Sequence, residues 1–313
     1  MARPHNMLHF APVSEPSRMK AQAVKLLFRF FATLPLHYAH ALGALLGKLL
    51  AWIPNRRRAT ARVNVALCFP AMRKEQQAQL VRASLIEYMK GVVEVGVLWT
   101  RERHEILGLV REISGADEFN RALSRGKGVI LAIPHLGSWE MVGIYGSIYS
   151  PMTSLFRSPP LTALGDFMRR ARERFGAQLV ATKHGGVRAL LHALRRGELI
   201  AILPDQVPAE TRGGEFAPFF GIPAFTMTLL SRLAAKSKAP VFFVYAERLP
   251  KGQGFHLHFL RAPDEVRSDD LQKSLQAINA MIEKCVRSCP EQYQWLYKRF
   301  RVRPYGAVSY YDN

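Results

Sequence analysis

A short apolar run that ends in a proline and a histidine constrains the fold of this chain more than any other feature. Residues 128–133 are a glycine and five aliphatic residues, and Pro134 and His135 follow at once. A turn of small residues then leads to Glu140 and to an apolar segment with helix-compatible spacing. This order predicts a buried strand, a tight turn and a helix. Functional side chains of open α/β sheets gather where strands end, so we expect the active site here.

The spacing of His135 and Glu140 restricts how the two side chains can meet. They are five positions apart, which is a rotation of roughly 140° on a straight helix, so one helix would not bring them to one face. They meet if His135 lies in the turn and Ser138 is the N-cap, which puts Glu140 in the first helical turn. Glu140 would then hold one imidazole nitrogen and leave the other to accept a proton. A turn histidine beside an unrelated acid is the alternative that the spacing leaves open.

Further blocks of the chain, together with this motif, carry a family resemblance. The string from His135 to Glu140 resembles the His-x4-Asp/Glu signature of the glycerolipid acyltransferase superfamily, and is similar in full to the late acyltransferases of lipid A biosynthesis, the lauroyl/myristoyl type. Similar blocks lie in the same order across residues 24–304, at 62–70, 156–159, 203–206, 218–221 and 294–300. The resemblance implies an α/β fold, with a mixed sheet flanked by helices and a membrane-associated helix at the N-terminus.

The resemblance also implies a reaction and its residues. A fatty acyl chain would move from a thioester, on acyl carrier protein or coenzyme A, to a hydroxyl of a lipid A precursor, with His135 as the base and Glu140 as its partner. Arg157, at the end of a predicted strand, would bind an anionic group or stabilise an oxyanion. Asp205 and Gln206 stand where many superfamily members have Glu-Gly, and would hold Arg157 or an amine, or fix the loop. No metal or redox cofactor is implied.

Two alternatives to this reaction remain open from the sequence. The same chemistry would serve another membrane lipid, such as a glycolipid or an ornithine-type lipid, as the acceptor. A protein of another class would only bind anionic lipid without catalysis, but such a binder needs neither His135 nor Glu140. Tyr297 departs from the family pattern, which often has histidine there, so the role of that position is in doubt.

The charge of the chain indicates anionic partners. Lys and Arg number 44 against 24 acids, a formal charge of +20. The sequence has no zinc finger, no aromatic RNA-binding signature and no helix-turn-helix pattern, so we expect the membrane leaflet and an acidic carrier protein rather than nucleic acid. The arginine-rich segment 161–176 is either a docking surface for that carrier or a solvated helix face. Cys68, Cys285 and Cys289 form no disulfide framework and suit a reducing compartment.

The N-terminal part divides into a leader and a hydrophobic segment. Residues 1–20 are predicted to be mobile, residues 21–115 membrane-associating and helical, and residues 116–313 the α/β acyltransferase domain. In residues 24–53, polar side chains and two glycines fall within one helical sector, with a kink expected at Pro35. This pattern predicts a helix in the membrane interface or against its own domain, with a tilted span as the alternative. The family resemblance implies a location at the cytoplasmic face of the inner membrane.

Four expectations concern the rest of the chain. Residues 75–114 are predicted to be helical, and residues 207–223 to be a flexible loop whose phenylalanines line an acyl chain or pack in the core. His184, in a glycine-rich turn, is a weak candidate for substrate contact. His256 and His258 share one face of a predicted strand, but no third ligand is in reach by sequence, so no metal is expected there.

Overall fold

The centre of the molecule is a seven-stranded mixed sheet, as predicted. The computed structural model describes residues 22, 26–157, 159, 162–182, 185–208 and 210–311; the predicted leader and His184 lie outside these ranges. The strand order is β1-β9-β8-β2-β5-β3-β4, and neighbours are parallel except β8 and β9. The strands are β1 (Val110–Ser114), β2 (Val129–Ala132), β3 (Met152–Phe156), β4 (Ala177–Ala181), β5 (Leu199–Ile202), β8 (Val241–Arg248) and β9 (Phe255–Arg261).

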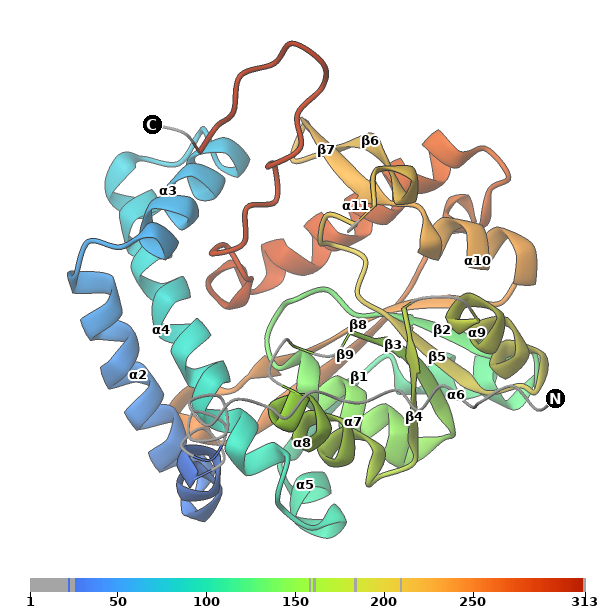
Figure 1. Cartoon of the computed structure of the whole chain (residues 1–313), viewed down its shortest axis with the longest axis horizontal. Helices are drawn as coiled ribbons and strands as arrows, with labels where there is room; N and C mark the ends of the chain where they lie inside the picture. The colour runs from blue at the N-terminus through green and yellow to red at the C-terminus, as the bar shows by residue number, and fades with distance from the viewer. Residues whose placement is uncertain are drawn as a thin grey trace, which may run out of the picture.

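Helices cover both faces of this sheet (Figure 1). One face packs against α9 (Gly186–Arg195), α10 (Leu229–Ser237) and α11 (Leu271–Ser288), and the other against α6 (Ala116–Ser124), α7 (Trp139–Tyr149) and α8 (Thr162–Glu173). The central strands β2 and β5 are buried at every position. This double burial explains why they are continuous apolar runs rather than alternating ones. Cys285 and Cys289 lie in the core on the α11 side, consistent with plain packing.

The direction of the strands brings the predicted site residues to one end of the sheet. Strands β2, β3, β5 and β8 are parallel to one another, so their carboxyl ends lie at the same end of the sheet. His135, Arg157 and Asp205 follow β2, β3 and β5, and Arg248 ends β8. The residues predicted for the active site therefore lie where the strands end.

A wall of three helices stands beside the sheet: α2 (Leu36–Trp52), α3 (Arg56–Cys68) and α4 (Lys74–Leu98) (Figure 1). The helical residues 26–33 end just before Pro35, and α2 starts after it, so the predicted interruption is confirmed. A Cβ at Gly43 or Gly47 would collide with the backbone of α4, at Lys90 or Ile86. The small-residue face of α2 therefore packs on α4, while its large apolar side chains, such as Trp52, are exposed. No helix in the described ranges is both long and apolar enough to cross a bilayer.

Two segment predictions were wrong. Residues 75–114 are not one helical stretch, because α4 ends at Leu98, α5 covers Arg103–Gly108 and β1 adds a strand beside β9. As an edge strand that is mostly exposed, β1 has no apolar alternation to reveal it. Residues 207–223 are not a loop throughout, because β6 (Gly214–Phe219) pairs with β7 (Ile222–Met227). The two turn residues, Phe220 and Gly221, both have positive φ, the turn that an Asn-Gly pair usually signals.

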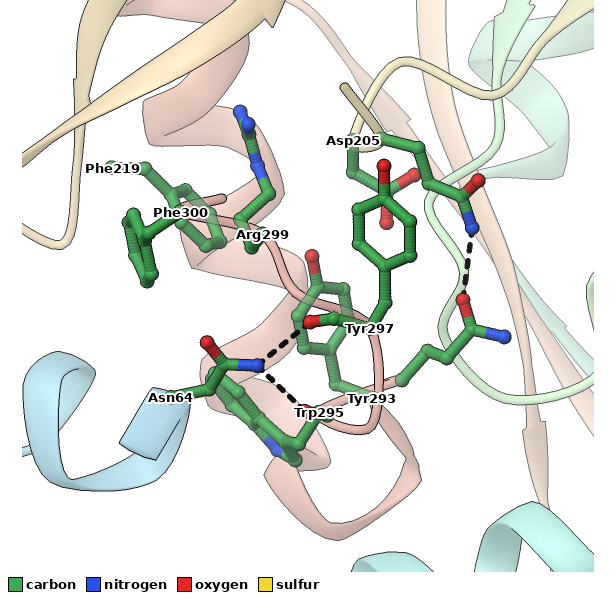
Figure 2. Close-up of a pocket in the computed structure, with 10 residues that line it drawn as sticks. Asn64, Asp205, Phe219, Tyr293, Trp295, Tyr297, Arg299 and Phe300 are labelled. Carbon is green, nitrogen blue, oxygen red and sulfur yellow. Dashed lines mark hydrogen bonds between the residues drawn. The ribbon is translucent and has the colours of Figure 1, made fainter. Parts of the chain in front are cut away.

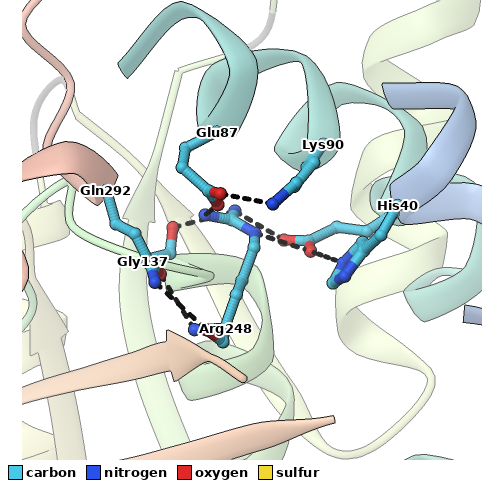
Figure 3. A network of polar contacts seen from close by, with 7 residues as sticks. His40, Glu87, Lys90, Gly137, Arg248 and Gln292 are labelled. Atoms are coloured by element: carbon cyan, nitrogen blue, oxygen red, sulfur yellow. Dashed lines mark hydrogen bonds and ion pairs between the residues drawn. The ribbon is translucent and has the colours of Figure 1, made fainter. Parts of the chain in front are cut away.

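A buried ionic network joins the helical wall to the sheet (Figure 3). The guanidinium of Arg248 donates to both carboxylate oxygens of Glu94 on α4, at 2.8 and 2.7 Å, and His40 of α2 lies 2.8 Å from the same carboxylate. Arg248 also donates to the carbonyl oxygen of Gly137, at 3.0 Å. Gly137 lies in the turn of residues 133–138 between β2 and α7, called the motif turn below. Burial alone would raise the pKa of Glu94, but Arg248 and the His40 contact outweigh burial and lower this pKa to about 2.

We predict that Glu94→Gln destabilises the protein in a pH-dependent way. The variant removes the two charged hydrogen bonds of the buried Arg248 and leaves it only the longer ion pair with Glu87, at 3.8 Å, which costs about 3–5 kcal/mol. Glu94 has an ordinary pKa of 4.5 and a pKa of about 2 in the fold. Its stabilising effect is thus complete above pH 4.5 and is lost as the pH falls toward 2. Urea unfolding measures the free energy of unfolding of the wild type and of the variant. The difference between the two values, the gap, should narrow from pH 7 to pH 3. Glu75→Gln, on the exposed start of α4, is the control, and a gap that stays constant with pH would contradict the prediction.

Candidate active site

Asp205 holds His135 at two points. Its Oδ1 lies 2.7 Å from Nδ1 of the imidazole, and its Oδ2 accepts the backbone N–H of His135 at 2.8 Å. The two residues follow β2 and β5, which are adjacent and parallel. The Asp205 side chain is only 2% exposed. Burial opposes its ionisation, but His135 outweighs burial by its charge and hydrogen bonds, and the pKa of this carboxyl is lowered. The imidazole is therefore oriented by a buried, ionised carboxylate.

The other ring nitrogen of His135 contacts Gln206. Nε2 lies 3.1 Å from the side-chain nitrogen of Gln206, which also donates to Oε1 of Gln294 at 3.0 Å. One tautomer satisfies all these partners: Nδ1–H donates to Asp205, and Nε2 accepts from Gln206. The lone pair at Nε2 is then the proton-accepting position of the ring. Asp205 and Gln206, both predicted as site residues, thus contact the two ring nitrogens of His135.

Glu140 lies in the first turn of α7 as predicted, but its hydrogen bonds go elsewhere. Its carboxylate accepts two bonds from the guanidinium of Arg172 on α8, one of them at 3.0 Å, and a third from the indole N–H of Trp99, at 3.0 Å. The expected contact of Glu140 with the imidazole is replaced by the contact of Asp205. Ser138 occupies the N-cap position, but its buried hydroxyl makes no hydrogen bond within the described part of the chain.

The motif turn is fixed between β8 and a segment near the C-terminus. Gly137 has a φ of +58°, and a Cβ there would collide with the carbonyl oxygen of Ala246 on β8. The N–H of Gly137 donates to Gln292 at 3.1 Å, and that of Ser138 to the Ala246 carbonyl at 2.8 Å. The carbonyl of His135 accepts from the backbone of Gln294 at 3.0 Å. Together with the Arg248 contact, these bonds set the position of His135.

Residues 294–300 connect α3 to the loop after β5 that carries Asp205 by hydrogen bonds to both (Figure 2). Asn64 of α3 donates to the carbonyls of Trp295 and Tyr297, at 2.6 and 2.7 Å. The hydroxyl of Tyr297 accepts the backbone N–H of Val207, at 2.9 Å. A cavity of about 10 Å³, room for about one water molecule, lies among these residues beside Asp205. Tyr297 therefore has a supporting contact in the loop that carries Asp205.

A larger pocket of about 490 Å³ opens beside the histidine. Its wall is largely apolar and comes from α7, α8, the central strands and β7; it includes Ile133, Ile144, Met152, Leu155, Phe156, Met168, Leu179, Leu203 and Met227. Its polar members include His135, Gln206, Arg157, Glu140 and Arg172. An apolar pocket with a few convergent polar groups is typical of a site for a mostly hydrocarbon ligand. Phe219 lies instead in the core and Phe220 packs against it, which is the second of the two roles expected for these rings.

The arginines of α8, with Arg174 directly after its last residue, divide into two groups. Arg172 is bound to Glu140, and Arg169 donates to Glu173 and to the carbonyl of Leu179, at 3.1 and 2.9 Å. Arg170 and Arg174 are exposed. A docking surface for an acidic partner on this helix would therefore depend on Arg170 and Arg174, whereas Arg169 and Arg172 support the pocket wall.

Comparison with known proteins identifies the family. The model of the bacterial lipid A biosynthesis acyltransferases matches residues 10–302. The chain belongs to this family. It is 28% identical to a lipid A biosynthesis palmitoleoyltransferase of Escherichia coli K12, over 86% of this chain and 87% of that protein. It is 28% identical to the lipid A biosynthesis lauroyltransferase of the same strain, over 89% of this chain and 90% of that protein. A lipid A biosynthesis acyltransferase of Haemophilus influenzae is 31% identical, over 85% of this chain and 83% of that protein. The protein is thus an acyltransferase of the late lipid A type.

Sequence reasoning missed several residues that support this site. Glu94 and Arg248 are single charged residues without a motif around them, and Arg172 lies in the arginine-rich segment, for which a docking or solvated role was expected. Only the tertiary structure shows that Arg172 meets Glu140 and that Arg248 joins Glu94 to Gly137. For Glu94 and Arg248 burial is the signal, since charged side chains are rarely buried without a partner. Arg157 lines the pocket, as its position after β3 suggested.

We predict that Gly137→Ala abolishes acyl transfer, whereas Gly126→Ala does not. Both glycines have positive φ, +58° and +66°, so both variants carry the same backbone strain of about 1 kcal/mol. Only at position 137 does the new Cβ also collide, because nothing lies within 4 Å of a Cβ at Gly126. The collision would displace the turn and His135 with it. Turnover and melting temperature of the two variants test this, and equal behaviour of both would show that the close approach of β8 is unimportant.

Proposed function

We propose that this enzyme transfers a fatty acyl chain from a thioester, on acyl carrier protein or coenzyme A, to a hydroxyl of a lipid A precursor, with His135 as the general base. The observation that carries the proposal is the imidazole clamped by the buried, ionised Asp205 at the edge of an apolar pocket. This arrangement leaves Nε2 to take a proton. The family supports the lipid A acceptor over the other membrane lipids that the sequence left open.

The reaction needs no covalent acyl-enzyme, because the thioester is already activated. Nε2 of His135 takes the proton of the acceptor hydroxyl as its oxygen attacks the thioester carbonyl carbon. When the tetrahedral intermediate collapses, the C–S bond breaks and the imidazolium returns the proton to the leaving thiolate. Asp205 stabilises the imidazolium while it exists. Arg157 and the backbone N–H groups at the start of α7 stabilise the oxyanion.

Asp205 takes the orienting role that the motif spacing suggested for Glu140. Glu140 stays in the proposed site as the partner of Arg172, with which it forms part of the pocket wall beside His135. Gln206 holds Nε2 of the free enzyme, and the acceptor hydroxyl replaces this contact. The two carboxylates therefore differ in function: one acts on the base, and the other on the shape and charge of the pocket.

Two isosteric variants separate these roles. Asp205→Asn removes the charge that stabilises the imidazolium, and should lower kcat by about 10²–10⁴-fold with little change in donor KM. Glu140→Gln should raise donor KM more than it lowers kcat. His135→Ala should abolish transfer while the melting temperature is kept. Steady-state kinetics over a range of donor concentrations decide between the two carboxylates. A collapse of kcat in Glu140→Gln, with Asp205→Asn nearly normal, would return the orienting role to Glu140.

We propose that the exposed apolar face of the N-terminal helices attaches the enzyme to the cytoplasmic face of the inner membrane. The large exposed hydrophobic side chains of this region are Leu26, Leu27, Phe30, Tyr38, Leu45, Leu49, Trp52 and Ile53. Next to them, Lys48, Arg58, Arg62 and Arg82 line a surface pocket of about 290 Å³ between α2, α3 and α4. Apolar side chains beside basic ones fit an interfacial helix on anionic lipid. Donors would then reach the pocket from the cytosol, and Arg170 and Arg174 are available to an acidic carrier.

Acidic side chains introduced on this apolar face should release the enzyme from membranes. Leu45→Glu combined with Leu49→Glu places two carboxylates on the exposed side of α2 without touching its packing on α4. Binding to vesicles that contain anionic phospholipid should fall at least tenfold, and binding of the wild type should weaken in high salt. Val187→Glu, an exposed apolar position on α9, is the control. Unchanged cosedimentation of the α2 variant with vesicles would show that another surface holds the membrane.

A further inference from the structure

A second group of functional side chains lies on the sheet, apart from the acyl-transfer site. Glu247 of β8 pairs in register with His256 of β9, and His258 follows on the same face of β9. Within the described ranges, one ligand atom from each of these three residues lies within 4.8 Å of the other two. Oε2 of Glu247 is 3.0 Å from Nε2 of His258, and the two imidazole rings stack with centroids 3.8 Å apart. Two strands thus bring two imidazoles and a carboxylate to one point.

We propose that Glu247, His256 and His258 bind a divalent transition-metal ion, for which Zn²⁺ is the best match. Two imidazole nitrogens and one carboxylate oxygen are a zinc donor set, and water completes the tetrahedron. Zinc–ligand bonds of about 2.0–2.1 Å place neighbouring ligand atoms about 3.3 Å apart. The 3.0 Å between Glu247 and His258 is close to this spacing, so a small side-chain rotation admits the ion. The sequence left His256 and His258 without a third ligand, and the neighbouring strand supplies it.

The surroundings of the cluster resemble the outer shell of a metal site. From β1, Ser114 Oγ contacts Nε2 of His256 at 2.8 Å, which leaves Nδ1 as the nitrogen that would bind the ion. Glu112 Oε2 lies 3.4 Å from this Nδ1. The ring of Tyr245 stacks on His258 at 4.4 Å. Such partners fix the rings of ligating histidines and raise their basicity. Each histidine side chain is 18% exposed, so the rings are held in place while an ion still has access from solvent.

The position of the cluster assigns it a structural role. Glu247 and Arg248 are successive on β8 and project to opposite faces: Arg248 holds the carbonyl of Gly137 at 3.0 Å, while Glu247 belongs to the cluster. Ala246, just before them, accepts the N–H of Ser138. An ion on Glu247 and the two histidines would cross-link β8 and β9 where β8 supports the motif turn. The proposed acyl transfer at His135 does not use the ion.

Zinc binding by the whole enzyme tests the proposal. The full-length protein, purified in detergent without a polyhistidine tag and stripped with EDTA, is titrated with ZnCl2 by calorimetry, and bound zinc is counted by mass spectrometry. We expect one zinc per chain with a micromolar or lower Kd, and a melting temperature that rises with zinc. His258→Gln and Glu247→Gln should weaken binding by at least tenfold. His104→Gln, at an exposed position outside the cluster, should bind as the wild type does.

Further readings separate loss of the site from loss of the fold. Ser114→Ala removes only the contact on Nε2 of His256 and should weaken binding by about tenfold, with an unchanged melting temperature in EDTA. Magnesium should give no binding, because imidazole is a poor ligand for it. The proposal is overturned if the wild type binds no zinc at 100 µM. It is also overturned if the His258→Gln and Glu247→Gln variants bind zinc as tightly as the wild type does. Acyl transfer by EDTA-treated protein is a separate readout of the proposed function, which the zinc result does not affect.

Discussion

The buried guanidinium of Arg248 is the contact on which the geometry of the site depends. It joins Glu94 of the helical wall to the carbonyl of Gly137 in the motif turn. Because a buried charge is strongly destabilising without its partners, Glu94 and Arg248 must lie together in the folded protein. The turn that carries His135 therefore takes its position from a helix far away in sequence. The helices α2 and α4 thus support the turn that carries His135.

The arrangement around His135 follows from parallel strands. Because β2 and β5 are adjacent and parallel, the residues that follow them lie side by side. Asp205 thereby reaches both the ring and the backbone of His135, which no residue of the same turn does in the described structure. Gln206 then meets the opposite ring nitrogen. The imidazole and the carboxylate that orients it thus come from two loops on one rigid sheet, and this rigidity favours precise geometry.

The sequence predicted the strand, turn and helix around His135 because these are local features with clear periodicity. It also predicted that Asp205 and Gln206 belong to the site, from the block that resembles the family. It did not reveal which carboxylate contacts the imidazole, because strand order is a property of the whole sheet. Glu140 was the nearest acid in sequence, but its carboxylate is bound by Arg172. The β6–β7 hairpin was missed for a local reason, since Phe220 stands where a turn of this type usually has asparagine.

The central claim is that Asp205 holds His135 in the tautomer with a proton on Nδ1 and a free lone pair on Nε2. Nitrogen NMR of enzyme labelled with ¹⁵N-histidine measures this directly, with the His135 signals assigned by their absence in His135→Gln. At pH 8, the account predicts a protonated Nδ1 and an unprotonated Nε2 in the wild type, and a loss of this preference in Asp205→Asn but not in Glu140→Gln. A proton on Nε2 in the wild type, or a tautomer that depends on Glu140 and not on Asp205, would contradict it.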